Sequence, residues 1–136
     1  MAGQFTGLQK SYINTDADGI AMYTGVVLDG ANQCKKPETD NEIPLGVVVN
    51  DERLADGHSA GGDQSGKQIA VMLDGIASIK LEDSVSAGDK VILATGGTAK
   101  KCPSTSGKYN VLGFAEKDGI AGDVIPVRMA YHVHTV

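Results

Sequence analysis

The sequence contains no tryptophan, and its aromatic residues are limited to two phenylalanines and four tyrosines. An interior built from this chain must therefore consist of Val, Ile, Leu, Ala and Met. Histidine is scarce, with three residues, and cysteine occurs twice. Hydrolases and transferases need a nucleophile with a base and an orienting group, or a metal cluster, and this supply is too small for either. The sequence therefore predicts a protein that is not an enzyme and that carries no cofactor.

Long apolar runs are also absent, since no stretch approaches the roughly 20 residues of a membrane span. The start, "MAGQFTGLQKSY", lacks the apolar core of a signal peptide. The net charge of −5 argues against nucleic-acid binding, which needs Lys and Arg clustered on one face. We therefore expect neither a membrane nor a nucleic acid as partner. In a cytoplasm, Cys34 and Cys102 are expected to be free thiols, because disulfides are rare in that compartment.

Metal and nucleotide motifs are incomplete. His132 and His134 are two residues apart and would share one face of a strand, but no third ligand lies near them in the sequence. The segment "GGDQSGK" (61–67) lacks the glycine spacing of a phosphate loop and the Ser or Thr after its lysine. The sequence favours two exposed histidines and predicts no metal site.

The apolar residues that are present occur in strand-length runs, separated by turns rich in glycine, of which the chain has 18. No run of ten or more residues has apolar side chains at helical spacing. The predicted strands lie within residues 19–28, 44–50, 67–73, 75–81, 89–95, 109–117 and 123–136. Pro126 cannot donate a ladder hydrogen bond, which predicts an edge or a bulge for its strand. The fold class is therefore all-β.

Three blocks occur twice in the same order along the chain. The first copies are "VVLDGANQCKKP" (26–37), "IPLGVVV" (43–49) and "KQIAVML" (67–73), and the second copies are "VILATGGTAKKCP" (91–103), "NVLGFAE" (110–116) and "DVIPVRM" (123–129). A repeat usually encodes a supersecondary unit that cannot bury its apolar face alone. We therefore expect two related β units that pack against each other.

Two segments fall outside this pattern. Residues 1–18 are polar with sparse apolar residues, among them Phe5, Leu8 and Tyr12. They are expected to be either an N-terminal arm that becomes ordered on a partner or the first strand of the barrel, and the sequence favours neither. Residues 51–68 form a long insertion rich in Gly and Asp, which is typical of a functional or mobile loop.

The middle of the chain, "MLDGIASIKLEDSVSAGDKVIL" (72–93), is superficially similar to a biotinyl or lipoyl carrier, in which two units also repeat. Such carriers present a modified lysine at the tip of a hairpin. Here Lys80 lies inside a predicted strand and Lys90 follows "AGD", so neither is offered at a tip. For this reason a carrier, or a small-ligand-binding β module, is kept only as the alternative function.

The order of "PLGVVV", "GKQIAVMLDGIASIKLEDSVSAGDKVILATGGTAKK" and "VLGFAEKDGIAGDVIPVRM" resembles the small bacteriophage capsid cement, or head decoration, proteins. The resemblance covers roughly residues 19–131. It implies a small β-barrel or β-tulip that forms a homotrimer, binds the major capsid protein on the exterior of the virion and stabilises the shell. It also implies synthesis in the host cytoplasm before assembly, and the family has no catalytic residues to transfer.

With this resemblance, the chain divides into an N-terminal arm, residues 1–18, and a β-barrel decoration domain, residues 19–136. Phe5, Leu8 and Tyr12 are then the candidates for capsid contact, because an arm can add a strand or insert apolar side chains at a partner's edge. The alternative is that these three side chains close the protein's own core.

Overall fold

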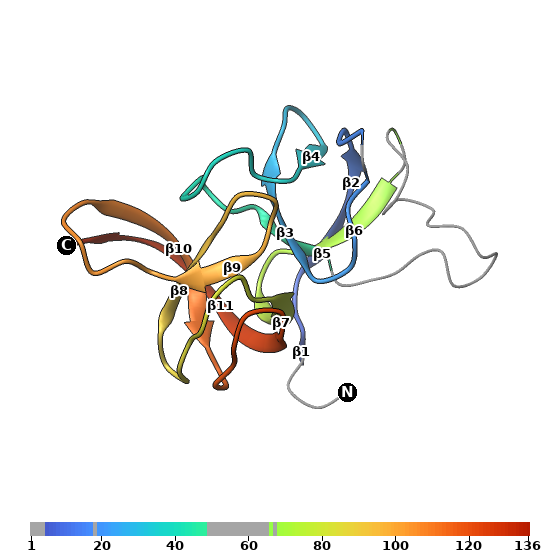
Figure 1. Cartoon of the computed structure of the whole chain (residues 1–136). Helices are drawn as coiled ribbons and strands as arrows, with labels where there is room; N and C mark the ends of the chain where they lie inside the picture. The colour runs from blue at the N-terminus through green and yellow to red at the C-terminus, as the bar shows by residue number, and fades with distance from the viewer. Residues whose placement is uncertain (1–4, 18, 49–65, 67) are drawn as a thin grey trace.

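The structure is a computed structural model that describes residues 5–17, 19–48, 66 and 68–136. The described residues form strands, turns and loops, and no helix among them is long and apolar enough to cross a membrane. The strands are β1 (Phe5–Thr6), β2 (Gln9–Asn14), β3 (Thr24–Leu28), β4 (Gln33–Lys35), β5 (Gly46–Val48), β6 (Gln68–Met72), β7 (Gly75–Lys80), β8 (Lys90–Leu93), β9 (Ala99–Lys101), β10 (Lys108–Ala115) and β11 (Val124–Thr135). The all-β prediction is confirmed (Figure 1).

The strands form a closed barrel and a second sheet. The barrel has the order β2-β4-β3-β5-β6, and the six-stranded sheet has the order β1-β7-β11-β10-β8-β9. Hereafter, unit 1 is β2 to β6 and unit 2 is β7 to β11. Figure 1 shows unit 2 beside unit 1, with the start of β10 and the end of β11 extending away from the rest of the molecule. The insertion predicted at 51–68 falls outside the described residues, apart from 66 and 68.

The two units have the same topology. In unit 1 the antiparallel neighbours run β4-β3-β5-β6-β2, and in unit 2 they run β9-β8-β10-β11-β7. Unit 1 closes through a parallel β2–β4 pair at Ile13 and Gln33, whereas unit 2 has a single parallel bridge, between Leu81 and Ala99, at the matching place. The predicted repeat is therefore one five-stranded unit used twice. Of the two alternatives for residues 1–18, the described part supplies a barrel strand, β2.

The repeated Leu-Gly step has a steric cause. A Cβ atom on Gly46, at the start of β5, would overlap the carbonyl oxygen of Met72 on β6. A Cβ atom on Gly113, in β10, would overlap the carbonyl oxygen of Arg128 on β11. Both glycines therefore lie where the next strand approaches too closely for any other residue.

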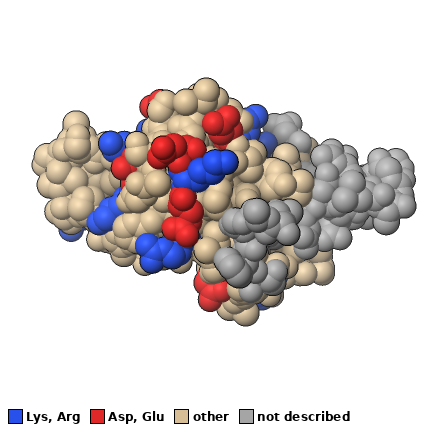
Figure 2. All heavy atoms as spheres, turned by 90° about the horizontal axis from the view of Figure 1, so that it is seen from below, with Lys and Arg blue, Asp and Glu red and all other residues tan. Residues whose placement is uncertain are grey.

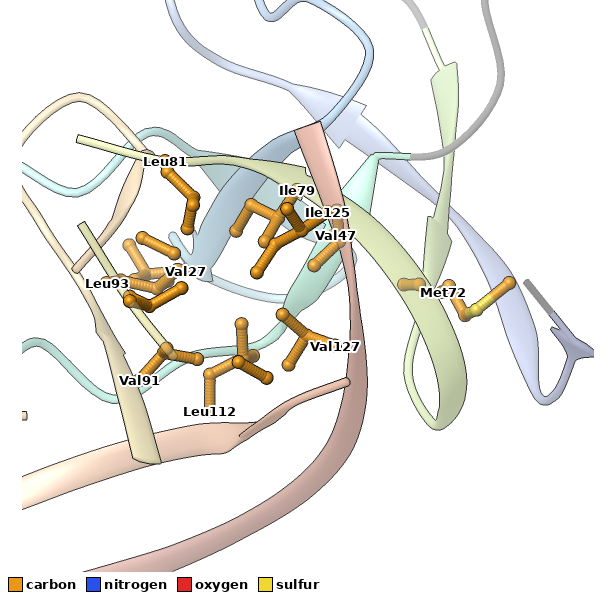
Figure 3. Packing of buried hydrophobic residues seen from close by; sticks show 14 residues of the cluster. Val27, Val47, Met72, Ile79, Leu81, Val91, Leu93, Leu112, Ile125 and Val127 are labelled. Atoms are coloured by element: carbon orange, nitrogen blue, oxygen red, sulfur yellow. The ribbon is translucent and has the colours of Figure 1, made fainter. Parts of the chain in front are cut away.

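The apolar side chains of unit 1 alternate between two cores, as the period of two along a strand requires. Val48 points into the barrel of unit 1, together with Val26. Val47 and Met72 point out of that barrel and join the core of unit 2, where they pack with residues such as Leu112. Figure 3 shows side chains of both units meeting in this shared cluster. The expectation that the two units pack against each other is thus confirmed.

Pro126 does not mark an edge or a bulge, contrary to the sequence prediction. Its strand, β11, lies between β7 and β10, and the register shift of the β10–β11 pair falls between Val111 and Gly113. On the β10 side, the carbonyl of Pro126 accepts a hydrogen bond from the backbone N–H of Glu116 (3.0 Å), one residue beyond the end of β10. The N–H group that proline lacks would point toward the same side, where the β10–β11 ladder has already ended at Ala115 and Val127, and the proline is tolerated for this reason.

Candidate docking surface

The histidines and cysteines of the described residues are engaged or buried. No group of three or more His, Cys, Asp and Glu residues among them could hold a metal ion. His132 and His134 do share one face of β11, but each uses its Nδ1 atom within the fold. That of His132 lies 2.8 Å from the carbonyl oxygen of Ala130, and that of His134 lies 3.1 Å from the Nζ atom of Lys90.

Both cysteines are free thiols in the structure, as predicted. Cys34 lies in the core of unit 1, where burial, and after it the charge of Asp29, raises the pKa of the thiol to about 11. Burial also raises the pKa of Cys102, and the nearby charge of Lys90 opposes this. Because the thiolate is the nucleophilic form, neither side chain is set up for covalent chemistry.

The lysines considered for a carrier role lie in strands. Lys80 is the last residue of β7 and pairs across the sheet with Val124, and Lys90 is the first residue of β8 and pairs with Phe114. Neither occupies the tip of a hairpin, which is where a carrier domain presents its modified lysine.

The three residues predicted to contact a capsid have different environments. Phe5 is in β1, where its backbone pairs with Ile76 of β7. Leu8 is 60% exposed, and two hydrogen bonds fix its backbone. Its N–H donates to Asp74 Oδ1 (2.6 Å), and its carbonyl accepts from the N–H of Leu73 (2.7 Å). Tyr12 is only 6% exposed and packs in the core of unit 1. Of Leu8 and Tyr12, only Leu8 has a side chain that a partner could contact in this conformation.

A groove of about 570 Å³ lies between the two units, lined by Val27, Leu28, Asn41, Glu42, Ile43, Pro44, Leu45 and Asn110. Asn41 holds its two walls together. Its side-chain Oδ1 accepts from the backbone N–H of Asn110 (2.7 Å), and its Nδ2 donates to the carbonyl of Lys108 (2.9 Å). The amide thus takes the place of a strand along the edge of β10, and Asn110 returns a bond from its own Nδ2 to the Asn41 carbonyl (2.9 Å).

Four large apolar side chains, each more than half exposed, gather at this groove. Leu28 and Ile43 line it directly. Tyr131 donates its hydroxyl hydrogen to Asn110 Oδ1 (3.0 Å), and Val133 pairs opposite Asn110 across the hairpin and shares the face of Tyr131. We call these four residues the groove surface. Exposed apolar patches of this kind mark interaction sites more often than isolated apolar residues do.

Sequence reasoning missed the groove surface. The alternation of Tyr131 and Val133 with two histidines was visible in the sequence, but it was interpreted for the histidines alone. Leu28 and Ile43 gave no signal, because they come near the hairpin only through the contact of Asn41 with β10.

Charges are mixed over the molecular surface. Figure 2 shows acidic and basic side chains interleaved over the middle of one face, while the end formed by the β10–β11 hairpin is largely uncharged in this view. Among the described residues, the shortest ion pair joins Lys100 of β9 to Asp40, in the loop that leads to the groove (2.5 Å). Hydrogen bonds from Lys100 and Thr95 lower the pKa of Asp40 to about 2. This pair helps to hold unit 1 against unit 2.

Comparison with known proteins agrees with this picture. The family model described as structural cement protein (E217 gp24/Pam3 gp6) matches residues 1–130. The crystal structure of the head fiber gp8.5 N base in bacteriophage phi29 superposes with a TM-score of 0.64 and 16% identity, over 90% of this chain and 95% of that chain. At this identity the likeness concerns the fold alone. Curated proteins gave no match. Because the family model spans nearly the whole chain, the protein belongs to the family of phage structural cement proteins.

Proposed function

We propose that this structural phage protein binds the outer surface of the capsid as a homotrimer and stabilises the assembled shell. The observation that carries the proposal is the match of the structural cement family over residues 1–130. A cement protein acts by adding contacts across the joints of a shell, and such contacts need exposed binding surfaces and no active site.

Trimer formation multiplies weak contacts. A trimer that has bound the shell through one subunit presents the other two at high effective concentration, so that three modest contacts combine into firm attachment. The groove surface suits the contact between copies, because interfaces of homo-oligomers are more apolar than the average protein surface. A second copy is the occupant to which we assign it.

Capsid contact involves the start of the chain in this proposal. Leu8 is exposed beside the β1–β7 pair, and Phe5 lies in β1 itself. Tyr12, the third residue predicted from the sequence, supports this region from inside the barrel, where it packs in the core of unit 1.

The test begins with phage heads that lack the protein. Purified protein is added, the heads are sedimented, and difference maps from electron microscopy locate the added density. We expect density on the outer surface and retention of packaged DNA to a higher temperature than in bare heads. The absence of density, or density inside the shell, would refute the proposal. Intact mass spectrometry at 14.1 kDa without a covalent adduct also separates this function from a carrier.

Two substitutions with a matched control assign the contacts. Ile43→Ser removes an apolar side chain of the groove surface, and Leu8→Ser removes one at the predicted shell contact. Ile120, in the turn before β11, is exposed to the same extent and belongs to neither surface, so Ile120→Ser is the control. We expect Ile43→Ser to lower the trimer fraction in native mass spectra. Leu8→Ser should weaken head binding without changing the trimer, and Ile120→Ser should do neither.

A further inference from the structure

A strip of basic and aromatic side chains crosses unit 2 on the face opposite the groove surface. Arg128 of β11 pairs across the sheet with Phe114 of β10, and Phe114 pairs with Lys90 of β8. His132 stacks on Phe114, with ring centroids 5.6 Å apart and planes 20° apart, and His134 contacts Lys90. We call these five residues the cationic strip.

The cationic strip is fixed in position but not neutralised. The guanidinium of Arg128 lies 5.1 Å from the centroid of the Phe114 ring, and this contact holds the guanidinium in position. Its only carboxylate within ion-pair distance in the described part of the chain is Glu116, at 3.9 Å, and Arg128 is 59% exposed. Such a long, exposed pair contributes little. Lys90 has no carboxylate within ion-pair distance among the described residues, although Asp89 beside it pairs with Lys101 at 3.8 Å.

Hydrogen-bond chemistry defines which atoms the cationic strip offers. A lysine ammonium can only donate, so Nδ1 of His134 accepts from Lys90 and Nε2 carries the N–H group of the ring. A carbonyl can only accept, so Nδ1 of His132 donates to Ala130. The donors that these contacts leave over are therefore the guanidinium N–H groups of Arg128, the remaining N–H groups of Lys90 and Nε2–H of His134. All of them suit an oxygen anion.

The repeat shows what this face does in the other unit. The row Lys90–Phe114–Arg128 of unit 2 corresponds to Gly25–Val47–Met72 of unit 1, because the same strands pair in the same register. In unit 1 the row is buried, and Val47 and Met72 pack against unit 2. In unit 1 this face therefore packs against unit 2, whereas in unit 2 no other described strand covers it. There Lys90, Phe114 and Arg128 stand in place of Gly25, Val47 and Met72, and the two charges favour a polar partner.

We infer that the cationic strip is the part of the protein that recognises carboxylate side chains on the outer surface of the capsid. This inference rests on the proposed function and names the chemistry of its partner. The chain carries a net charge of −5, so an acidic partner is repelled by most of the surface and attracted at the strip, which orients attachment. The two cations of the strip, Lys90 and Arg128, are too few for firm binding of a nucleic acid, whose affinity comes from neutralising many phosphates.

The start of the chain lies in line with the cationic strip. Ile76 of β7 pairs with Arg128 on one side and with Phe5 of β1 on the other. One cross-strand row therefore runs from Phe5 through Ile76, Arg128 and Phe114 to Lys90. The sequence-based candidate for capsid contact and the strip, reached by different arguments, occupy the same row of the sheet.

The test compares two double variants with the same change in net charge. Lys90→Gln with Arg128→Gln removes the cations of the strip, and Lys35→Gln with Lys108→Gln removes two lysines that lie neither in the strip nor at the start of the chain. We expect the strip variant to bind heads at least about tenfold more weakly at low salt, with the difference shrinking as salt is raised. The control variant should bind as the wild type does. Equal weakening of both variants would overturn the inference, and so would loss of the trimer in the strip variant, which would make the strip a contact between copies.

A second measurement does not depend on heads. An oligoglutamate peptide is titrated into the isotope-labelled protein, and the imidazole NMR signals of His132 and His134 are followed. We expect shifts in the wild type that are absent from the strip variant. If the wild type fails to bind heads but shows these shifts, the proposed function fails and the strip's preference for carboxylates stands. An absence of shifts, or equal competition by single-stranded DNA, overturns the inference.

Discussion

Truncation of Met72 should destabilise both units at once. Met72 belongs to β6 of unit 1, is fully buried, and packs in the core that contains Leu112 of unit 2 (Figure 3). Met72→Ala removes the outer atoms of this side chain from a site enclosed by both units. Substitutions of this kind cost about 2–5 kcal/mol, a large part of the about 5–15 kcal/mol by which a domain of this size is stable.

Urea unfolding measures the effect, with amide signals of Val26 in the barrel core of unit 1 and Leu112 in the shared core as separate NMR probes. We expect both probes to report one transition, at a lower urea concentration than in the wild type. Protomer concentration must be held fixed, because subunit association shifts apparent stability. Ile120→Ala, at an exposed turn, should change the stability by no more than about 0.5 kcal/mol. Separate transitions at the two probes, or a cost below about 1 kcal/mol, would refute a shared core.

Three further outcomes follow from the same contacts. Gly113→Ala should lower the free energy of unfolding in urea by about 3 kcal/mol or more, because the added Cβ overlaps the adjoining strand. Gly122→Ala, at a φ of 91° but in open space, should lower it by about 1 kcal/mol. Equal losses would contradict the steric reason for the repeated glycine. The folded-state pKa of Asp40 is lowered to about 2, so the Asp40–Lys100 pair stabilises the protein at pH values above the ordinary pKa of Asp, and this stabilisation is lost as pH falls from about 4 toward 2. Asp40→Asn should therefore lower the free energy of unfolding by about 1 kcal/mol or less, because Asp40 is nearly half exposed, and the difference from the wild type should disappear over that pH range. A difference that stays constant with pH would show that the charge does not matter. Cys34, whose pKa is raised to about 11, should react with an aromatic disulfide reagent at pH 8 only when urea unfolds the barrel, and rapid labelling of the folded protein would mean that the core of unit 1 is open.

The sequence predicted the strands that are apolar along their length and failed on those that are not. β8, β10 and β11 were evident because their side chains alternate or form continuous apolar runs. The short strands β4 and β9 escaped notice, because three residues that include lysines carry no periodic signal. Their place is set by pairing with β3 and β8, which the sequence encodes only through the repeat.

The candidate site was less predictable than the fold. Tyr12 was predicted from its apolar character in a polar segment, yet that character serves the barrel core, because β2 closes unit 1 against β4 and β6. Whether an apolar residue near a chain end faces inward depends on closure between distant strands, which local sequence does not reveal. The groove surface and the cationic strip both depend on cross-strand register in the same way.

The differences between the two units indicate how a repeated scaffold acquires binding surfaces. In the part of the chain that the structure describes, β5 and β6 of unit 1 have three and five residues, whereas their counterparts β10 and β11 have eight and twelve. The added length forms the projecting hairpin, which presents Tyr131 and Val133 to the groove on one face and His132 and His134 to the cationic strip on the other. What the units share accounts for folding and for their mutual packing. What distinguishes them lies on the hairpin and the row beside it, which is where the proposed function places the contacts that give specificity.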